Sequence, residues 1–407
     1  MRLLDAVLRQ GLPLESAAGK ACASLTVAAD KRLAVAIAGE VLRRMPDYDA
    51  LIDSATQRPL PDDAKARTVL RLALAQTLAL DTPPHAAIAT ALPLLQGGPR
   101  RLAHGVFGTL MRGKARLPDV PVLPESVARR WTEHWDGETV TAAARAIADP
   151  PPLDLTLVDS AETERWCDEL GGHSLLPGHV RVARAGVTDL PGFAEGRWWV
   201  QDIAASLPAR LFGEGGDRTA LDLCAAPGGK TLQLAARGWR VTALDRSQSR
   251  LARLSQNLDR TGLAAETVAA DMLAWQPAAP ADAILLDAPC SATGIFRRHP
   301  DVLYRATPRI IAECVKLQVK MLARAAHWLA PGGLLVYAVC SLEPEEGEAV
   351  IDGILAARAD LTIEPIEIGE CPEGLVPDER GCLRVLPGNI ADPGGADGFF
   401  MARLRRG

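Results

Sequence analysis

The stretch of sequence that decides the fold is Leu221-Asp222-Leu223-Cys224-Ala225-Ala226-Pro227-Gly228-Gly229-Lys230-Thr231, where an apolar run leads into a turn of small residues. Small residues let the backbone approach a ligand closely, and a helix that begins after such a turn offers free N–H groups to a negatively charged group. The stretch ends like a P-loop but lacks the first glycine of that motif, which argues against an NTPase. It predicts a strand, a ligand-binding turn and a helix, with a purely structural turn as the alternative.

The residues around this stretch alternate between strand-like and helical patterns. Apolar runs that read as strands cover residues 219–224, 239–245, 283–287 and 334–340, and helical patterns separate them. Such alternation is typical of a doubly wound α/β fold with a largely parallel sheet, in which ligands bind at the carboxyl ends of the strands.

Acidic residues stand at or near the ends of the successive predicted strands. These are Asp222, Asp245 and Asp287, and Asp271 follows the strand-like residues 266–270. In nucleotide-binding folds an acid after the second strand binds the ribose hydroxyls. Carboxylates would repel a pyrophosphate but attract the sulfonium of S-adenosylmethionine, so this cofactor is expected rather than NAD. Each acid taken singly could instead cap a helix.

Two cysteines also stand at the ends of predicted strands. Cys290 lies in Asp287-Ala288-Pro289-Cys290-Ser291-Ala292-Thr293-Gly294, and Cys340 lies in Val339-Cys340-Ser341. A lone cysteine is most often a buried hydrophobic residue, but two thiols beside a cofactor site favour chemistry. A thiolate that attacks carbon 6 of a pyrimidine makes carbon 5 nucleophilic, so these residues predict methylation at carbon 5. Asp287 would hold the ring N3 or the exocyclic amine of an unstacked base.

The chain divides into three predicted domains. Residues 1–125 show apolar residues at three- and four-residue spacing, as in residues 31–44 and 64–80, and predict an all-helical domain. Residues 126–215 mix short segments and predict a small α+β subdomain. Residues 216–407 carry the doubly wound pattern.

Composition limits the function classes. The 407 residues are 48% hydrophobic and 23% charged, as in globular proteins, and no apolar run has the roughly 18 residues of a membrane span, so a cytoplasmic protein is expected. The eight cysteines form no CxxC pair, which argues against a metal site.

The charge pattern leaves room for a nucleic-acid partner. A net charge of −5 argues against nonspecific coating of nucleic acid. Residues 99–130, however, hold seven Lys and Arg residues, which predict an RNA-facing patch or simply a solvated helix surface. Arg297, Arg298 and His299 are further candidates for phosphate contacts.

Four motifs together resemble the Sun family of RNA cytosine-5 methyltransferases, and the resemblance covers essentially the whole chain. The helical front resembles the domain of the antitermination factor NusB at residues 70–76 and 84–87. The combination is similar to the enzymes of that family that act on small-subunit (16S) ribosomal RNA. The four motifs are Cys-Ala-Ala-Pro-Gly-Gly-Lys-Thr at 224–231, Asp-Ala-Pro-Cys-Ser-x-Thr-Gly with Arg-Arg-His-Pro-Asp at 287–301, Val-Cys-Ser with its trailing acids at 339–346, and Asp-Gly-Phe-Phe-Met-Ala-Arg-Leu at 397–404.

The resemblance implies a NusB-like domain, an RRM-like RNA-binding subdomain and a class I S-adenosylmethionine-dependent methyltransferase domain. It implies that Cys340 is the nucleophile and that Cys290 assists release of the product, an order that the residues alone leave open. RNA, expected to be ribosomal, and S-adenosylmethionine are the implied partners of a monomer that binds neither metal nor membrane. The implied cofactor contacts are Cys224, Ala225, Ala226, Pro227, Gly228, Gly229, Lys230, Asp245, Arg250, Asp271 and Asp287.

Two other readings stay open at this stage. The chain could be an RNA-binding assembly or antitermination factor with a vestigial methyltransferase fold, or a transferase that acts on DNA or a small molecule. The presence of both cysteines and all four acids favours an enzyme, and the NusB-like front favours RNA. The chain also departs from the family at Ala292, where glycine is usual, and at Val339, where threonine is common.

Overall fold

The computed structural model describes residues 1–148, 150–183 and 185–407, which divide into two compact units. The first unit comprises Met1–Pro150 together with Phe296–Ala306, and the second comprises Pro151–Ile295 together with Thr307–Gly407. The chain therefore passes from the second unit into the first and back again.

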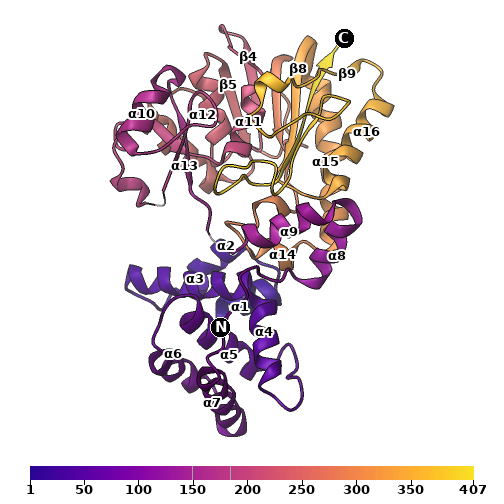
Figure 1. Ribbon diagram of the computed structural model, residues 1–407. Helices are drawn as coiled ribbons and strands as arrows, with labels where there is room; N and C mark the ends of the chain where they lie inside the picture. Colours follow the sequence, from indigo (N-terminus) through magenta and orange to yellow (C-terminus); the bar gives the residue numbers. More distant parts are fainter. Residues whose placement is uncertain (149, 184) are drawn as a thin grey trace. The chain divides into compact units, whose positions relative to one another are not determined.

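The first unit is built of helices around α5, whose label is shown in Figure 1. Helix α5 is buried nearly all round, and Val69, Leu70, Ala73 and Leu74 have no exposed surface. The sequence pattern at residues 31–44 and 64–80 correctly predicted α3 and α5. The helices of this unit are α1 Arg2–Leu8, α2 Leu14–Ala21, α3 Ala28–Arg43, α4 Met45–Ser54, α5 Lys65–Leu78, α6 Pro84–Ala91, α7 Gly97–Arg112, α8 Glu125–His134, α9 Gly137–Ala146 and α14 Val302–Arg305.

Two buried arginines of α5 are neutralised by acids of α4. The guanidinium of Arg71 donates two hydrogen bonds of 2.7 Å to the carboxylate of Asp49, and Arg67 donates one of 2.6 Å to Asp53. Paired, bidentate contacts of this kind let a guanidinium lie inside a protein without an unsatisfied charge. The two helices are thereby held by ion pairs as well as by apolar contact.

Residues 296–306 are an integral part of the helical unit. Phe296 is fully buried with its ring centroid 5.5 Å from that of Trp131 on α8. The carboxylate of Asp301 accepts a hydrogen bond of 3.2 Å from the backbone N–H of Leu14, and the Tyr304 hydroxyl donates one of 2.9 Å to the carbonyl of Leu42. These residues had been predicted as part of the domain at 216–407, whereas the structure groups them with the helices.

Helices α8 and α9 also belong to the first unit. The boundary in the structure therefore lies at Pro150 and not near residue 125 as the sequence suggests. The reason is that Trp131 and Val127 of α8 bury their side chains in this unit, and the local sequence pattern does not specify which core they join.

The second unit begins with a small three-stranded antiparallel sheet of order β2-β1-β3 and helix α10, Thr163–Leu170. The strands are β1 Leu153–Leu157, β2 His179–Val182 and β3 Trp198–Val200. Arg181 donates hydrogen bonds of 2.7 and 2.9 Å to the buried carboxylate of Asp154, which joins β2 to β1 through side chains. A small α+β segment is thus present between residues 151 and 200, within the second unit.

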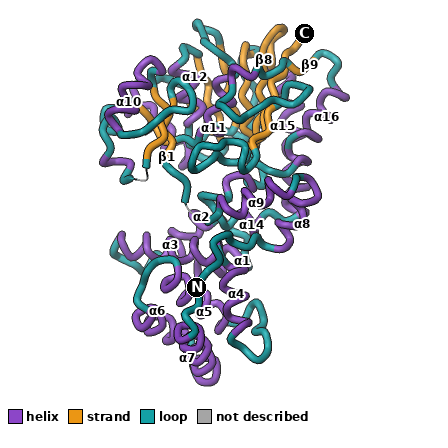
Figure 2. Tube along the Cα trace, in the orientation of Figure 1, coloured by secondary structure: helices purple, strands orange, loops and turns teal. Residues whose placement is uncertain are grey.

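The main sheet of the second unit has eight strands, seen in orange in Figure 2. Its order is β10-β11-β8-β7-β4-β5-β6, with β9 paired to β11, and the five strands β6, β5, β4, β7 and β8 run parallel. Strand β11 pairs antiparallel with β8, and β10 and β9 pair antiparallel with β11. The strands are β4 Thr219–Leu223, β5 Arg240–Asp245, β6 Glu266–Ala269, β7 Ala281–Asp287, β8 Leu329–Val339, β9 Leu361–Ile363, β10 Leu383–Val385 and β11 Phe399–Arg406.

Helices cover both faces of this sheet (Figure 1). Side chains of successive strand residues point to opposite faces, so Tyr337 and Val339 of β8 join the core under α15 and α16, whereas Val336 and Ala338 join the core under α11 and α12. The predicted doubly wound α/β fold is confirmed. The helices are α11 Ile203–Arg210, α12 Gly229–Ala236, α13 Gln248–Thr261, α15 Pro308–Trp328 and α16 Glu348–Ala357.

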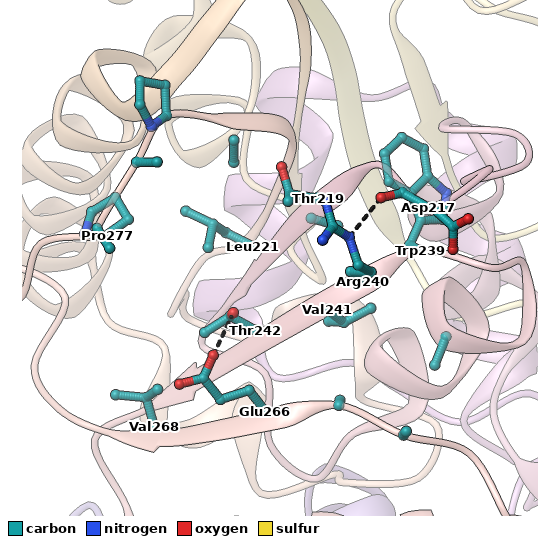
Figure 3. Close-up of a pocket in the computed structure, with 18 of the residues that line it drawn as sticks. Asp217, Thr219, Leu221, Trp239, Arg240, Val241, Thr242, Glu266, Val268 and Pro277 are labelled. Carbon is teal, nitrogen blue, oxygen red and sulfur yellow. Dashed lines mark hydrogen bonds between the residues drawn. The ribbon is translucent and has the colours of Figure 1, made fainter.

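A pocket of about 900 Å³ lies at the amino-terminal halves of the parallel strands (Figure 3). Thr219, Arg240 and Glu266 line it, and residues 270–280, which lead from β6 to β7, contain no helix to cover this part of the sheet. Arg240 donates to the carbonyl of Asp217 at 2.6 Å, and Thr242 to Glu266 at 3.1 Å. The pocket is therefore distinct from the carboxyl ends of the strands, where the predicted site residues lie.

The Phe296→Ala substitution tests whether residues 296–306 help to stabilise the helical unit. Removal of a fully buried phenylalanine that packs on Trp131 is expected to lower the free energy of unfolding by about 3–5 kcal/mol. Chemical denaturation followed by tryptophan fluorescence measures the change. Leu94→Ala, at a side chain of the same unit that is 41% exposed, is the control and is expected to cost much less. Equal effects of the two substitutions would contradict the packing described.

Candidate active site

The turn after β4 has the conformation that its small residues predict. Cys224 adopts a φ of 65° and Gly228 a φ of 113°, and α12 begins directly afterwards at Gly229. A Cβ atom at Gly228 would lie 2.7 Å from Cγ of Leu254, so the turn has no room for a side chain there. The strand, the turn and the helix are all present, and the turn leaves backbone accessible at the start of α12.

Asp222 lies beneath this turn and is fully buried. Its Oδ2 accepts a hydrogen bond of 2.5 Å from the Thr231 hydroxyl, while its Oδ1 has no partner among the described residues. Burial raises the pKa of Asp222 to about 7, against which the Thr231 hydrogen bond and the Lys230 charge act in the lowering direction. Asp222 therefore joins β4 to α12 through the Thr231 hydroxyl, and its carboxyl titrates near neutral pH.

Asp245 joins the end of β5 to the turn. Its carboxylate accepts hydrogen bonds of 3.2 Å from the backbone N–H of Ala226 and 2.8 Å from that of Ser247. Arg250, in the first turn of α13, lies 3.5 Å from Asp245 and also donates to the carbonyl of Ala226. The structure thus brings together three of the predicted cofactor contacts, namely the turn, Asp245 and Arg250.

Asp271 lies near Asp245, because the preceding Ala270 donates a backbone hydrogen bond of 3.1 Å to the Asp245 carbonyl. It is exposed, two residues after the end of β6, and its carboxylate accepts a hydrogen bond of 2.9 Å from the backbone N–H of Leu273. Asp271 therefore stabilises a turn, and the helix-capping role considered for each acid does not apply here because no helix follows β6. A cofactor contact of Asp271 stays a prediction.

Asp287, at the end of β7, pairs with the lysine of the turn. Lys230 Nζ lies 2.8 Å from Asp287 Oδ2 and 5.3 Å from the ring centroid of Phe399 on β11. Burial alone would lower the pKa of Lys230, but the charge of Asp287 and the hydrogen bond to it raise that pKa above its usual range. The ion pair was not predicted from the sequence, although both residues lie in the motifs that were singled out.

The two thiols lie side by side because β7 and β8 are adjacent parallel strands. Asp287 is in register with Ala338, so the chain leaves both strands at the same level and Cys290 Sγ lies 3.5 Å from Cys340 Sγ. The hydrogen bond to Cys340, together with burial, raises the pKa of Cys290 well above its usual range. The two sulfurs therefore lie within hydrogen-bond distance of each other, and either thiol can be the donor.

The loop after Cys290 is tightly fitted to the loop of Cys340. The backbone N–H of Gly294 donates a hydrogen bond of 3.0 Å to the carbonyl of Cys340. A Cβ atom at Gly294 would lie 2.0 Å from the carbonyl oxygen of Gly398, so only glycine fits. Ala292 adopts a φ of 59°, the left-handed conformation that glycine adopts more readily than alanine.

The basic pair that follows this loop does not form an exposed cationic surface. Arg297 is only 3% exposed within the helical unit, where Arg43 donates a hydrogen bond of 3.0 Å to its carbonyl. This burial argues against the phosphate contact of Arg297, which stays a prediction. Arg298 and His299 are half-buried.

A buried network of hydrogen bonds around Glu346, next to the thiols, could not be predicted from the sequence. Ser291 and Ser341, the residues that follow the two cysteines, both donate hydrogen bonds to Glu346, which has no exposed surface. Nothing in the sequence distinguishes Glu346 from the exposed Glu345 beside it. Its importance becomes visible only when the fold brings the two serines to one carboxylate.

Among the residues that the structure describes, neither a metal cluster nor a membrane helix is found. The described part of the chain contains no group of three or more His, Cys, Asp or Glu side chains that could hold a metal ion. Within the same residues, no helix combines the length and the apolar character that a membrane crossing requires.

Comparison with known proteins places the chain in a family. Residues 212–405 match the family model described as 16S rRNA methyltransferase RsmB/F, and residues 1–97 match that of the NusB family. The ribosomal RNA small subunit methyltransferase B of Xylella fastidiosa (strain Temecula1) is 35% identical over 99% of this chain and 96% of its own length. The chain belongs to the RsmB/F family. The protein of the same name from Klebsiella pneumoniae is also 35% identical, over 92% of this chain and 90% of its own.

Solved structures confirm the fold. The crystal structure of PH0851 has a TM-score of 0.74 at 22% identity and covers all of this chain and 98% of its own. The structure of NSun6 from Pyrococcus horikoshii has a TM-score of 0.59 at 19% identity, over 70% of this chain and 98% of its own. The NusB-like helical front and the Rossmann-like methyltransferase fold expected from the Sun-family motifs are therefore both confirmed.

The raised pKa of Asp222 predicts a pH-dependent contribution to stability. The pKa of the Asp222 carboxyl is about 7 in the folded chain and about 3.9 in an unfolded chain, so the folded chain binds this proton more tightly. The parent therefore loses stability as pH rises from about 4 to about 7. Asp222→Asn does not titrate. Over this window its free energy of unfolding is expected to rise relative to that of the parent by up to about 4 kcal/mol.

Urea denaturation at several pH values between 4 and 8 measures this difference. Asp168→Asn, at an exposed position on α10, is the control and is expected to track the parent. A constant offset between Asp222→Asn and the parent across the whole range would show that Asp222 does not titrate there.

Proposed function

We propose that this chain transfers a methyl group from S-adenosylmethionine to carbon 5 of a cytosine in small-subunit ribosomal RNA through a covalent cysteine adduct. The observation that carries the proposal is the pair of thiols, Cys290 and Cys340, 3.5 Å apart at the ends of adjacent strands. They lie in the motifs that follow β7 and β8, and Asp287, three residues before Cys290, pairs with Lys230 of the turn. A thiol that forms a bond to the base is what the low reactivity of carbon 5 requires.

The residues around the turn fit S-adenosylmethionine. Gly228 and Gly229 let the turn pack closely on Leu254 and Gln201, and the carboxylates of Asp245 and Asp287 contact the turn at the Ala226 N–H and at Lys230. Asp245 would accept hydrogen bonds from the ribose hydroxyls, and the carboxylates would favour the positive sulfonium. The bound cofactor would supply the electrophilic methyl group. Residues 224–230, Arg250 and Asp271 complete the proposed set of contacts.

Cys340 is the proposed nucleophile. Its thiolate forms a bond to carbon 6 of the cytosine, and the electron pair of the 5,6 double bond makes carbon 5 nucleophilic toward the methyl group. Loss of the proton from carbon 5 then restores the double bond and expels the Cys340 sulfur. This order rests on the Sun-family motif that Val339-Cys340-Ser341 resembles, since two sulfurs 3.5 Å apart fit either order.

Cys290 and Asp287 are proposed to serve the same cycle. The Cys290 sulfur is close enough to the Cys340 sulfur to assist release of the methylated base from the adduct. Asp287 would hold the proton on N3 or the exocyclic amine, and Lys230 keeps this carboxylate in place at 2.8 Å. The base must reach these groups unstacked, so a single-stranded or flipped cytosine is the expected substrate.

The names of the relatives support ribosomal RNA as the substrate. The similar proteins of Xylella fastidiosa and Klebsiella pneumoniae, which match nearly the whole chain, are both named ribosomal RNA small subunit methyltransferase B. The small sheet of β1, β2 and β3 and the helical unit are the parts of the chain proposed to add RNA contacts. The exposed Arg100, Arg101 and Lys114 of the helical unit supply cations for phosphates.

Substitution of each cysteine separates the two proposed roles. Cys340→Ala is expected to abolish both methylation and any covalent RNA complex, because it removes the attacking sulfur. Cys290→Ala is expected to leave a covalent complex that survives a denaturing gel, because release is slowed. Incubation with labelled small-subunit RNA and S-adenosylmethionine measures both outcomes, with Cys167→Ala on α10 as the control. A trapped complex with Cys340→Ala would mean that the two roles are reversed.

Substitution of Asp245 tests the cofactor site. Asp245→Ala removes the acceptor proposed for the ribose hydroxyls and the bond to the Ala226 N–H, so the affinity for S-adenosylmethionine is expected to fall about tenfold or more, or at least about 1.4 kcal/mol. Asp271→Ala is expected to have a smaller effect because its carboxylate is exposed. Isothermal titration calorimetry measures both, with Asp168→Ala as the control. Unchanged affinity in both variants would remove this assignment.

A further inference from the structure

Glu346 is a buried carboxylate that lies between the loops of the two thiols. It is the last residue of the short 3-10 helix Pro344–Glu346, which follows Cys340, and it has no exposed surface. A buried carboxylate needs several hydrogen-bond donors to offset the loss of water. The donors around Glu346 come from both cysteine loops.

Each cysteine is followed by a serine that donates to this one side chain. Ser291 donates its backbone N–H to Glu346 Oε1 at 2.8 Å and its hydroxyl to Oε2. Ser341 donates its hydroxyl to Oε2 at 2.5 Å, and the two serine hydroxyls lie 3.3 Å apart. The loops of Cys290 and Cys340 are thus joined through a single carboxylate, which each loop binds through the serine that follows its cysteine.

Two further residues hold Glu346, one through its carboxylate and one through its backbone carbonyl. Gln318 of α15 donates to Glu346 Oε1 at 3.1 Å and to the carbonyl of Pro289 at 2.9 Å, on the other side of Cys290. The buried hydroxyl of Tyr337 on β8 donates to the backbone carbonyl of Glu346 at 2.6 Å. Glu346 is therefore held by the helix and the strand as well as by the two loops.

We propose that Glu346 is a positioning residue that holds the sulfurs of Cys290 and Cys340 at the separation that the methyl transfer needs. This inference rests on the proposed function for its catalytic consequence, but the geometry of the two thiols can be tested alone. Hydrogen bonds to a carboxylate are stronger than those between neutral groups, and displacement of a reacting group by about 1 Å can cost about 100-fold in rate. Glu346 acts on the two thiols through Ser291 and Ser341, the residues that follow the cysteines.

Two substitutions at Glu346 give opposite expectations. In Glu346→Gln the remaining oxygen can still accept from the Ser291 N–H and from Gln318, while the new amide can donate to the two hydroxyls, which can rotate to accept. This variant should keep the thiols in place. Glu346→Ala leaves the Ser291 N–H and Gln318 without their acceptor and should let the loops separate. Glu345→Ala, at the exposed neighbour in the same turn, is the control.

Disulfide formation between the two thiols reports their separation without any RNA. Diamide takes two protons and two electrons from a pair of thiols and leaves a disulfide, and the rate depends on how close the sulfurs are held. Peptide mass spectrometry of the full chain then quantifies the Cys290–Cys340 bond over time. The rate is expected to fall about tenfold or more in Glu346→Ala and to stay within about twofold of the parent in Glu346→Gln and Glu345→Ala.

Methylation kinetics supply the second measurement. Glu346→Ala is expected to lower kcat about 100-fold with little change in KM for RNA or in the affinity for S-adenosylmethionine, and Glu346→Gln is expected to restore most of kcat. If Glu346→Ala fails to fold, as loss of S-adenosylmethionine binding would show, the double variant Ser291→Ala, Ser341→Ala takes its place. It removes both hydroxyl bridges and should also slow disulfide formation.

Three results would overturn the inference. The first is a rate of disulfide formation in Glu346→Ala, or in the double serine variant that replaces it, equal to that of the parent. The second is equally slow disulfide formation in Glu346→Gln and Glu346→Ala. The third is slow disulfide formation in the Glu345→Ala control. Failure of the proposed function looks different, since the parent would then not methylate RNA although its disulfide rate still depended on Glu346.

Discussion

The pairing of β7 with β8 is the constraint on which the active site depends. Parallel strands in register end at the same level, and the register of Asp287 with Ala338 brings Cys290 and Cys340 to one edge of the sheet, although 50 residues separate them in the chain. The same edge receives Lys230 from the turn after β4, because β4 is the other neighbour of β7. Three chain segments therefore meet at one place through backbone pairing alone.

The sheet places the loops, but polar side chains fix their conformation. Glu346, which has no exposed surface, accepts four hydrogen bonds next to the thiols. An apolar side chain in its place would fill the space but would not hold the two loops through hydrogen bonds. Lys230 and Asp287 form an ion pair that is partly open to solvent. The buried network around Glu346 and the partly exposed ion pair of Lys230 and Asp287 together fix the side chains near the thiols, as pre-organised sites require.

Much of the catalytic unit could be predicted from the sequence because its signals are local. An apolar run that ends in Cys-Ala-Ala-Pro-Gly-Gly specifies a strand, a turn and a helix start without reference to the rest of the chain. The positions of Asp245 and Arg250 at the turn follow from the strand order of this fold class. Glu346 and the partnership of Lys230 with Asp287 could not be predicted, because these contacts depend on which strands lie side by side.

Residues 296–306 show most clearly where local signals fail. The chain leaves the loop whose Gly294 donates to the carbonyl of Cys340, and two residues later Phe296 enters the core of the helical unit. In this unit it buries Val302 and Leu303 as well, before α15 begins at Pro308 in the second unit. Without residues 1–150 these apolar side chains would lose the core that covers them. The helical unit thus supplies the core for residues 296–306, and the loop of Cys290 is connected to this segment through the backbone.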